Sequence, residues 1–189
     1  MDKTALSVVW LTPPRVLDVC RRAAHVERFA LDPCTEPSNP TGAVVFYTEA
    51  DDGLTRSWTA DLLALSQLRK VVWMNPPYGL SYSKWLDKLH VACNTMRDVG
   101  VPFVLYALLP ANRTETDYIQ RLMRDPSLLC MVYVRKRLRF TRPDGSKAKS
   151  NPYPSMLYVF AHGLSVDAGI LGELGVVVPW CVAPEANQQ

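Results

Sequence analysis

Apolar residues follow two alternating patterns along the chain. Short runs rich in β-forming residues are typical of buried strands, and two of them stop directly before a proline. The expected strands are residues 28–32, 71–74, 103–109 and 128–134, with a shorter β-prone run at 44–47. Segments between these runs are expected to be helices, and two of them repeat apolar side chains every three or four positions. The expected helices are residues 14–24, 83–98 and 114–124.

The order of these elements predicts the fold class. Strands alternate with helices up to residue 134, which favours an α/β protein with a doubly wound, Rossmann-like sheet. Residues 136–140 and 155–160 are then expected to pair as an antiparallel C-terminal hairpin. We expect a single domain over residues 1–189, with a core from about residue 10 to about 162. The pattern assigns no role to residues 163–189.

One strand ends in an unusual turn, Asn75-Pro76-Pro77-Tyr78-Gly79. Proline cannot continue a β-ladder, so the strand at 71–74 must stop at Asn75. The two prolines fix their own φ and push the preceding residues toward extended geometry, which makes the turn stiff. The turn therefore lies at the carboxyl end of a parallel strand, where open α/β sheets bind their ligands.

The groups on this turn suit chemistry on an amino group of a nucleobase. Such an amine is a poor nucleophile because its lone pair is delocalised into the ring. The Asn75 side chain and the Pro76 carbonyl can accept its N–H bonds, draw the nitrogen toward tetrahedral geometry and free the lone pair. Tyr78 can stack on a base that has left the helix. The alternative is a proline-rich turn with a packing tyrosine, which the strand–turn–helix context disfavours.

Composition narrows the class of protein. The chain has 189 residues, of which 48% are hydrophobic and 21% charged, as in soluble globular proteins. No apolar run reaches membrane-spanning length. Five scattered cysteines without a Cys-X-X-Cys pair, and three isolated histidines, favour reduced thiols in the cytoplasm and no metal site.

Charge is unevenly distributed. The chain carries a formal charge of +3, but residues 135–149 alone carry +6, which leaves −3 for the rest. The basic residues of this segment are Arg135, Lys136, Arg137, Arg139, Arg142, Lys147 and Lys149. A basic stripe on a slightly acidic body is typical of nucleic-acid binding. The alternative is a solvated loop, because charge runs are usually only hydrated.

The start of the first expected helix offers a second candidate site. Thr12 precedes Pro13 and Pro14, a pattern in which the hydroxyl caps the helix and proline occupies its first turn. A hydroxyl and free backbone N–H groups at a helix N-terminus also attract carboxylates. Capping is the more frequent use of such a threonine, and the two roles can coexist.

Several short motifs occur together with the Asn75–Gly79 turn. They are Trp-Leu-Thr-Pro at 10–13, Leu-Asp-Pro at 31–33, Asp-Gly-Leu at 52–54 with Trp58, Trp85 with Lys88, Leu-Leu-Pro-Ala at 108–111 and Arg-Leu-Arg-Phe at 137–140. Each is weak alone, but the ordered set resembles the phage and prophage family of DNA N6-adenine methyltransferases. The resemblance spans residues 10 to about 160. It implies a methyltransferase sheet, S-adenosylmethionine as cofactor and adenine in DNA as substrate.

The resemblance also implies roles for individual residues. Asn75, Pro76, Pro77 and Tyr78 would form the catalytic turn. Thr12, Asp32, Asp52 and Asn75 would hold the cofactor, with Thr12 near its carboxylate, Asp32 near its amino group and Asp52 near its adenine. The general methyltransferase pattern has a Gly-X-Gly loop after the first strand, and residues 34–41 lack it. The named family also lacks these glycines.

We therefore expect a site-specific enzyme that methylates N6 of adenine in double-stranded DNA, with the target base flipped out. Its location would be the bacterial cytoplasm, encoded by a phage or prophage, and it could belong to a restriction–modification pair. One alternative is a methyltransferase for RNA or a protein glutamine amide, because Asn-Pro-Pro-Tyr also serves amides. The other is a non-catalytic nucleic-acid-binding protein on a decayed methyltransferase fold.

Overall fold

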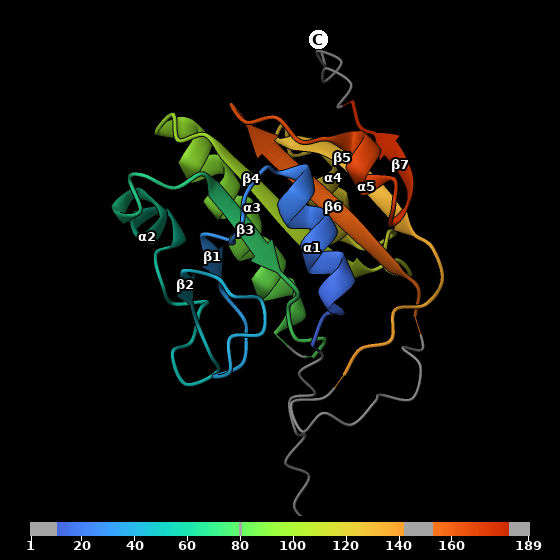
Figure 1. Cartoon of the computed structure of the whole chain (residues 1–189), viewed down its shortest axis with the longest axis horizontal. Helices are drawn as coiled ribbons and strands as arrows, with labels where there is room; N and C mark the ends of the chain where they lie inside the picture. The colour runs from blue at the N-terminus through green and yellow to red at the C-terminus, as the bar shows by residue number, and fades with distance from the viewer. Residues whose placement is uncertain (1–10, 80, 142–152, 182–189) are drawn as a thin grey trace, which may run out of the picture.

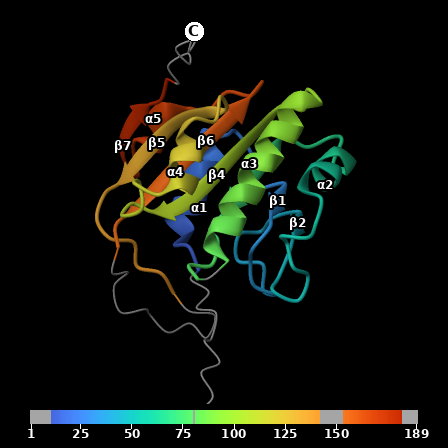
Figure 2. The same ribbon diagram turned by 180° about the vertical axis from the view of Figure 1, so that it is seen from behind.

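The computed structural model describes residues 11–79, 81–141 and 153–181, and its centre is a seven-stranded mixed sheet. The strands are β1 (Leu31–Asp32), β2 (Val45–Phe46), β3 (Lys70–Met74), β4 (Phe103–Pro110), β5 (Leu128–Val134), β6 (Ser155–His162) and β7 (Gly175–Pro179). The helices are α1 (Pro14–Ala23), α2 (Trp58–Ala64), α3 (Tyr82–Asp98), α4 (Asp117–Met123) and α5 (Ala168–Leu171). Figure 1 shows α1 and α5 on one face, and Figure 2 shows α3 and α4 on the other.

The strand order is β2-β1-β3-β4-β6-β5-β7. The first four strands in this order run parallel. Strand β6 then enters antiparallel between β4 and β5, and β7 adds an antiparallel edge beside β5. This mixed sheet is compatible with the Rossmann-like methyltransferase fold that the sequence predicts.

Of the two strands expected to form the C-terminal hairpin, the structure contains only the second. Residues 136–140 form no strand; Lys136 has φ 64°, a left-handed conformation that interrupts the chain after β5. Leu138 and Phe140 pack into the core instead, and Thr141 forms an isolated antiparallel bridge with Leu11. The second expected strand exists as β6, but it pairs with β4 and β5.

Three further elements differ from expectation. The third expected helix is shorter than residues 114–124, because α4 begins after its N-cap residue Thr116 and ends at Met123. Helix α2 was not expected; Ser57 caps it by accepting a hydrogen bond from the Ala60 N–H at 3.4 Å. Residues 163–180, which had no assigned role, supply α5 and β7.

Side chains of the central strands alternate between two apolar layers. Val71 and Trp73 face the layer that α1 and α5 cover, while Val72 and Met74 face the layer of α3 and α4. Every residue of β4 is buried, as the continuous apolar run predicts. The face of α3 expected from its spacing is also confirmed, since Trp85, Leu89, Cys93 and Met96 are buried. None of the described helices is long and apolar enough to cross a membrane.

Candidate active site

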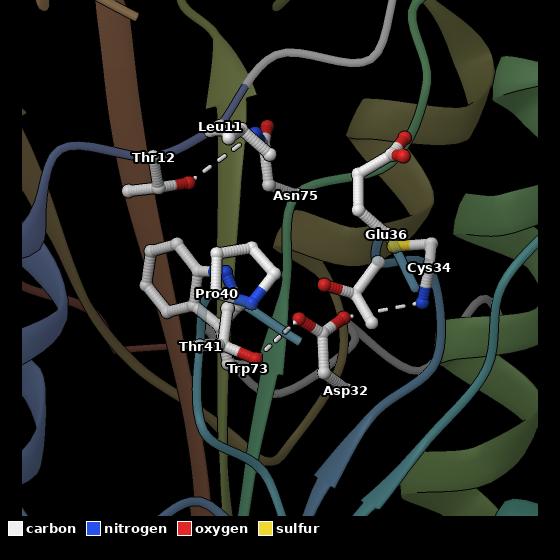
Figure 3. Close-up of a pocket in the computed structure, with 10 residues that line it drawn as sticks. Leu11, Thr12, Asp32, Cys34, Glu36, Pro40, Thr41, Trp73 and Asn75 are labelled. Atoms are coloured by element: carbon white, nitrogen blue, oxygen red, sulfur yellow. Dashed lines mark hydrogen bonds between the residues drawn. The ribbon is translucent and has the colours of Figure 1, made fainter. Parts of the chain in front are cut away.

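A small pocket opens where β1 and β3 end (Figure 3). Its walls come from the segment before α1, from the connection after β1, and from the end of β3. The lining residues are Leu11, Thr12, Asp32, Cys34, Thr35, Glu36, Pro40, Thr41, Trp73 and Asn75. The structure therefore brings three predicted site residues, Thr12, Asp32 and Asn75, into one pocket at the carboxyl edge of the parallel strands.

The Asn75 side chain is held from two sides. Its Nδ2 donates to the Thr12 hydroxyl at 3.3 Å, and its Oδ1 accepts from the Tyr78 hydroxyl at 3.0 Å. The Thr12 contact replaces the expected helix cap: the N-cap residue of α1 is Pro13, and no side chain caps the helix. Proline at Pro14 has no N–H, which reduces the need for a capping acceptor at this end.

Tyr78 is half-buried beside Asn75. Its hydroxyl also lies 3.5 Å from the Leu108 carbonyl, and its ring meets Tyr82 edge-on with centroids 5.8 Å apart. Burial raises the pKa of Tyr78 well above its ordinary value, so the phenol stays protonated and donates. These contacts fix the amide of Asn75 with its oxygen toward Tyr78 and its nitrogen toward Thr12.

Asp32 is a buried carboxylate, with 2% of its surface exposed. Its Oδ2 accepts from the Thr41 hydroxyl at 2.8 Å, and its Oδ1 accepts from the Cys34 N–H at 3.1 Å. Burial raises the pKa of Asp32 to about 6, against the lowering effect of these hydrogen bonds. No described Lys, Arg or His forms an ion pair with it; the described ion pairs all involve other acids.

The pocket residues that follow β1 were not among the predicted site residues. The connection from residue 33 to 44 takes the place of a glycine-rich loop, and Asn39 shapes it. Asn39 has φ 47°. Its Oδ1 accepts from the Ala43 N–H, and its Nδ2 donates to the Ala43 carbonyl. This turn brings Thr41 and Glu36 to the pocket. The connection has no periodic pattern, so only its asparagine and its turn glycine signalled a defined conformation.

Asp52 lies in an exposed turn and is not among the residues that line the pocket. It has φ 50°, and its Oδ1 accepts from the Leu54 N–H at 3.3 Å, which is an ordinary aspartate turn. The next residue, Gly53, lies against the chain after β1: a Cβ there would come within 2.0 Å of the Pro33 carbonyl oxygen. Trp58 is buried and donates to the Gly53 carbonyl at 2.8 Å.

A protein-family model described as DNA N-6-adenine-methyltransferase (Dam) matches residues 3–174. The chain belongs to this family. Membership agrees with the resemblance seen in the ordered motifs, and it implies methylation of N6 of adenine in DNA as the general activity. A search of curated proteins finds no match for the chain.

The basic segment expected to bind DNA is partly described in this Dam-family chain. Arg135, Lys136, Arg137 and Arg139 are exposed, while Arg142, Lys147 and Lys149 lie outside the described residues. The segment runs to the pocket edge, because Leu11 and Thr141 exchange two backbone hydrogen bonds of 2.9 and 3.3 Å. Leu11 lines the pocket and precedes Thr12.

The pocket of this Dam-family chain is lined mainly by oxygen-bearing side chains. Within residues 11–79, 81–141 and 153–181, no three or more His, Cys, Asp or Glu side chains lie together as a metal site would require. The polar groups near Asn75 are hydroxyls, an amide and the carboxylates of Asp32 and Glu36. Hydroxyls and carboxylates suit an organic ligand that carries an ammonium group.

Proposed function

We propose that the chain transfers a methyl group from S-adenosylmethionine to N6 of an adenine flipped out of duplex DNA. The observation that carries this proposal is the position of the Asn75 amide. It lies at the end of β3, in one pocket with the buried carboxylate of Asp32, and Thr12 and Tyr78 hold its orientation. The family match supplies adenine as the base and DNA as the polymer.

The residues of the pocket fit the methionine end of the cofactor. Asp32 is buried and has no cationic partner among the described residues, so an ammonium group within reach would compensate its desolvation. Thr41 and the Cys34 N–H already fix the carboxylate, which leaves it preorganised to accept from such a group. When bound, the cofactor supplies an electrophilic methyl group attached to a sulfonium.

Asn75 and Pro76 act on the other reactant, the amine of adenine. A side-chain amide oxygen can accept two hydrogen bonds, so Oδ1 can accept from the amine while it accepts from Tyr78. The Pro76 carbonyl accepts the second N–H, and Pro77 keeps that carbonyl rigid because its ring fixes φ. Both acceptors draw the lone pair of the nitrogen out of conjugation. The methylated nitrogen would carry the positive charge after the transfer and lose its proton to solvent water, so no charged base is required beforehand.

Tyr78 has two tasks in this proposal. Its hydroxyl orients the Asn75 amide, and its half-buried ring leaves a face on which the flipped adenine stacks. The ring is braced edge-on by Tyr82, which restricts its motion. Orientation of the amide and stacking of the base are therefore coupled through one side chain.

The exposed residues Arg135, Lys136, Arg137 and Arg139 would follow the DNA backbone, together with Arg142, Lys147 and Lys149 of the same segment. Apolar and basic side chains alternate at residues 137–140: Leu138 and Phe140 pack inward, and Arg137 and Arg139 are exposed. This alternation anchors a basic surface whose far end is bonded to Leu11. Phosphate contacts there position the duplex without reading its sequence.

The test is transfer of label from tritiated S-adenosylmethionine to duplex DNA, followed by nucleoside analysis. We expect label in N6-methyladenine from wild type, with none when adenine is absent from the duplex. Label in RNA or in a glutamine amide instead would overturn the substrate assignment. Cofactor binding by calorimetry separates these outcomes from a non-catalytic protein, which would show neither transfer nor cofactor affinity.

A further inference from the structure

Three tyrosines form a row that leads away from the site. The ring of Tyr78 meets Tyr82 at the start of α3, and Tyr82 meets Tyr118 of α4, with centroid distances of 5.8 and 5.7 Å and interplanar angles of 79° and 82°. Edge-to-face contacts of this kind hold aromatic rings in fixed mutual orientation. The row therefore gives a rigid wall that begins at the proposed catalytic tyrosine.

Arg113 completes this wall. It lies on the connection between β4 and α4, and its guanidinium carbon is over the Tyr82 ring, 5.4 Å from the centroid. Its Nη1 donates to the Tyr118 hydroxyl at 3.2 Å. Strands β3 and β4 are parallel neighbours, so the connection after β4 leaves the sheet at the same edge as Asn75. In Figure 2 the start of α3 and the end of β4 lie at this edge.

The charge of Arg113 is not neutralised by the described part of the chain. The side chain is exposed, and none of the ion pairs among the described residues includes it; those pairs involve Arg22, Arg56, His90, Arg97 and Arg121. The guanidinium is nevertheless held by a ring and a hydroxyl. An arginine that is both fixed and uncompensated is preorganised for an anion, since less side-chain freedom is lost when the anion binds.

We propose that Arg113 binds a backbone phosphate of the target strand next to the adenine that is methylated. The Tyr82 ring and the Tyr118 hydroxyl hold the guanidinium, but Tyr118 takes only one N–H of Nη1, which leaves the other N–H donors for a ligand with the geometry of a phosphate. The inference rests on the proposed function, and it assigns Arg113 a positioning role outside the basic segment of residues 135–149.

The first experiment measures binding of a labelled DNA duplex across a salt series. Arg113→Gln keeps a polar side chain and removes the charge; the matched control is Arg124→Gln, an exposed arginine at the C-cap of α4. We expect Arg113→Gln to lower affinity about tenfold and to reduce the salt slope by about one, and Arg124→Gln to change neither. Cofactor affinity should remain at the wild-type value in both variants. Equal behaviour of the two variants would overturn the proposal.

Two further variants separate a phosphate contact from a packing role. Tyr118→Phe removes the acceptor of Arg113 but keeps the charge, so the salt slope should stay at the wild-type value. Arg113→Lys should likewise restore the slope lost in Arg113→Gln. If instead the slope falls in Tyr118→Phe and is not restored by lysine, Arg113 acts through packing and the proposal is wrong.

The second experiment places single neutral methylphosphonate linkages around the adenine that wild type methylates. One position should cost wild type about tenfold in affinity and cost Arg113→Gln nothing further, because the contact is already lost. Equal sensitivity of both proteins at every position would contradict a phosphate contact. Absence of methyl transfer by wild type would refute the proposed function alone, since the salt series still tests Arg113.

Discussion

Two polar clusters lie at opposite ends of the central strands, and helix α3 runs between them. The site cluster, Thr12, Asp32, Asn75 and Tyr78, lies near the helix start. The far cluster consists of His90, Asn94 and Arg97 on α3 with Asp125 and Ser127 before β5. Each cluster contains one almost fully buried carboxylate, with Asp32 2% and Asp125 0% exposed.

The two carboxylates differ in their partners. Asp125 lies 2.8 Å from His90 Nδ1, accepts from the Ser127 N–H at 2.8 Å and accepts from Arg97 at 3.5 Å, so the chain supplies it with an arginine counter-charge. Asp32 accepts from a hydroxyl and a backbone N–H, and burial raises its pKa to about 6. A carboxylate that the chain itself supplies with cations stabilises the fold, whereas one left without them is suited to a cationic ligand.

The first test of this comparison replaces one asparagine of each cluster with alanine. Asn75→Ala should lower turnover a hundredfold or more and change cofactor affinity far less, although Asn75 lines the pocket, because the amide is needed mainly in the transition state. Asn94→Ala, the matched control, removes the same group from the far cluster and should reduce thermal stability while turnover per folded molecule stays normal. Initial rates with tritiated cofactor and melting curves measure both; normal turnover in Asn75→Ala would disprove the mechanism.

Isosteric changes of the two buried carboxylates should move stability in opposite directions. Asp125→Asn leaves Arg97 without its counter-charge and should lower the free energy of unfolding by about 3 kcal/mol. Asp32→Asn should raise it by up to about 3 kcal/mol at pH 7.5, the value of a pKa rise from 3.8 to about 6 at about 1.4 kcal/mol per pH unit. Urea denaturation measures both, and a loss of stability in Asp32→Asn would contradict the assignment.

The same raised pKa predicts how stability and binding depend on pH. Since the folded state holds the proton of Asp32 more tightly than the unfolded chain, this group makes stability fall as pH rises from about 4 to about 6. Cofactor affinity should follow the opposite course, dropping up to tenfold per pH unit below about 6 as the carboxylate is protonated. In Asp32→Asn both dependences should flatten; calorimetry over pH 5–8 checks this, and an unchanged profile would assign the titration to another group.

The smallest expected effect tests whether Asp52 belongs to the site cluster. Asp52→Ala should weaken cofactor binding by about 1–3 kcal/mol if its carboxylate accepts the amino group of the cofactor adenine. Asp51 is a matched control in the same turn, because its carboxylate is already bonded to the Thr48 N–H and hydroxyl at 2.9 and 2.7 Å. Calorimetry that shows no loss for Asp52→Ala would remove it from the site and leave Glu49 as the next candidate.

Local rules predicted the elements that position the catalytic turn. The apolar run before Asn75 and the two prolines after it specify a strand and its end, and both depend on a few neighbouring residues. The buried face of α3 follows from spacing alone. Asp32 was predicted at a strand end for the same reason, although its strand is shorter than expected.

What could not be predicted depends on contacts between distant residues. Thr12 was expected to cap a helix, but Asn75, which lies 63 positions later, donates to its hydroxyl. The predicted hairpin was wrong because β6 pairs with β4 at eight positions and not with residues 136–140. No local sequence pattern reveals this pairing. Thr41 and Glu36 reach the pocket through an irregular turn, and irregular turns have no period to detect.

The insertion of β6 between β4 and β5 has a consequence for biosynthesis. Strand β6 follows both of its neighbours in the chain, so it is translated after them. Each of β4 and β5 therefore has an unpaired edge until Ser155–His162 has been made. Open edges of apolar strands recruit other chains, which makes the nascent protein vulnerable to aggregation. Slow translation before residue 155, or a split of the gene at that point, would prolong this exposure. Co-expression of a holdase chaperone would reduce the resulting aggregation.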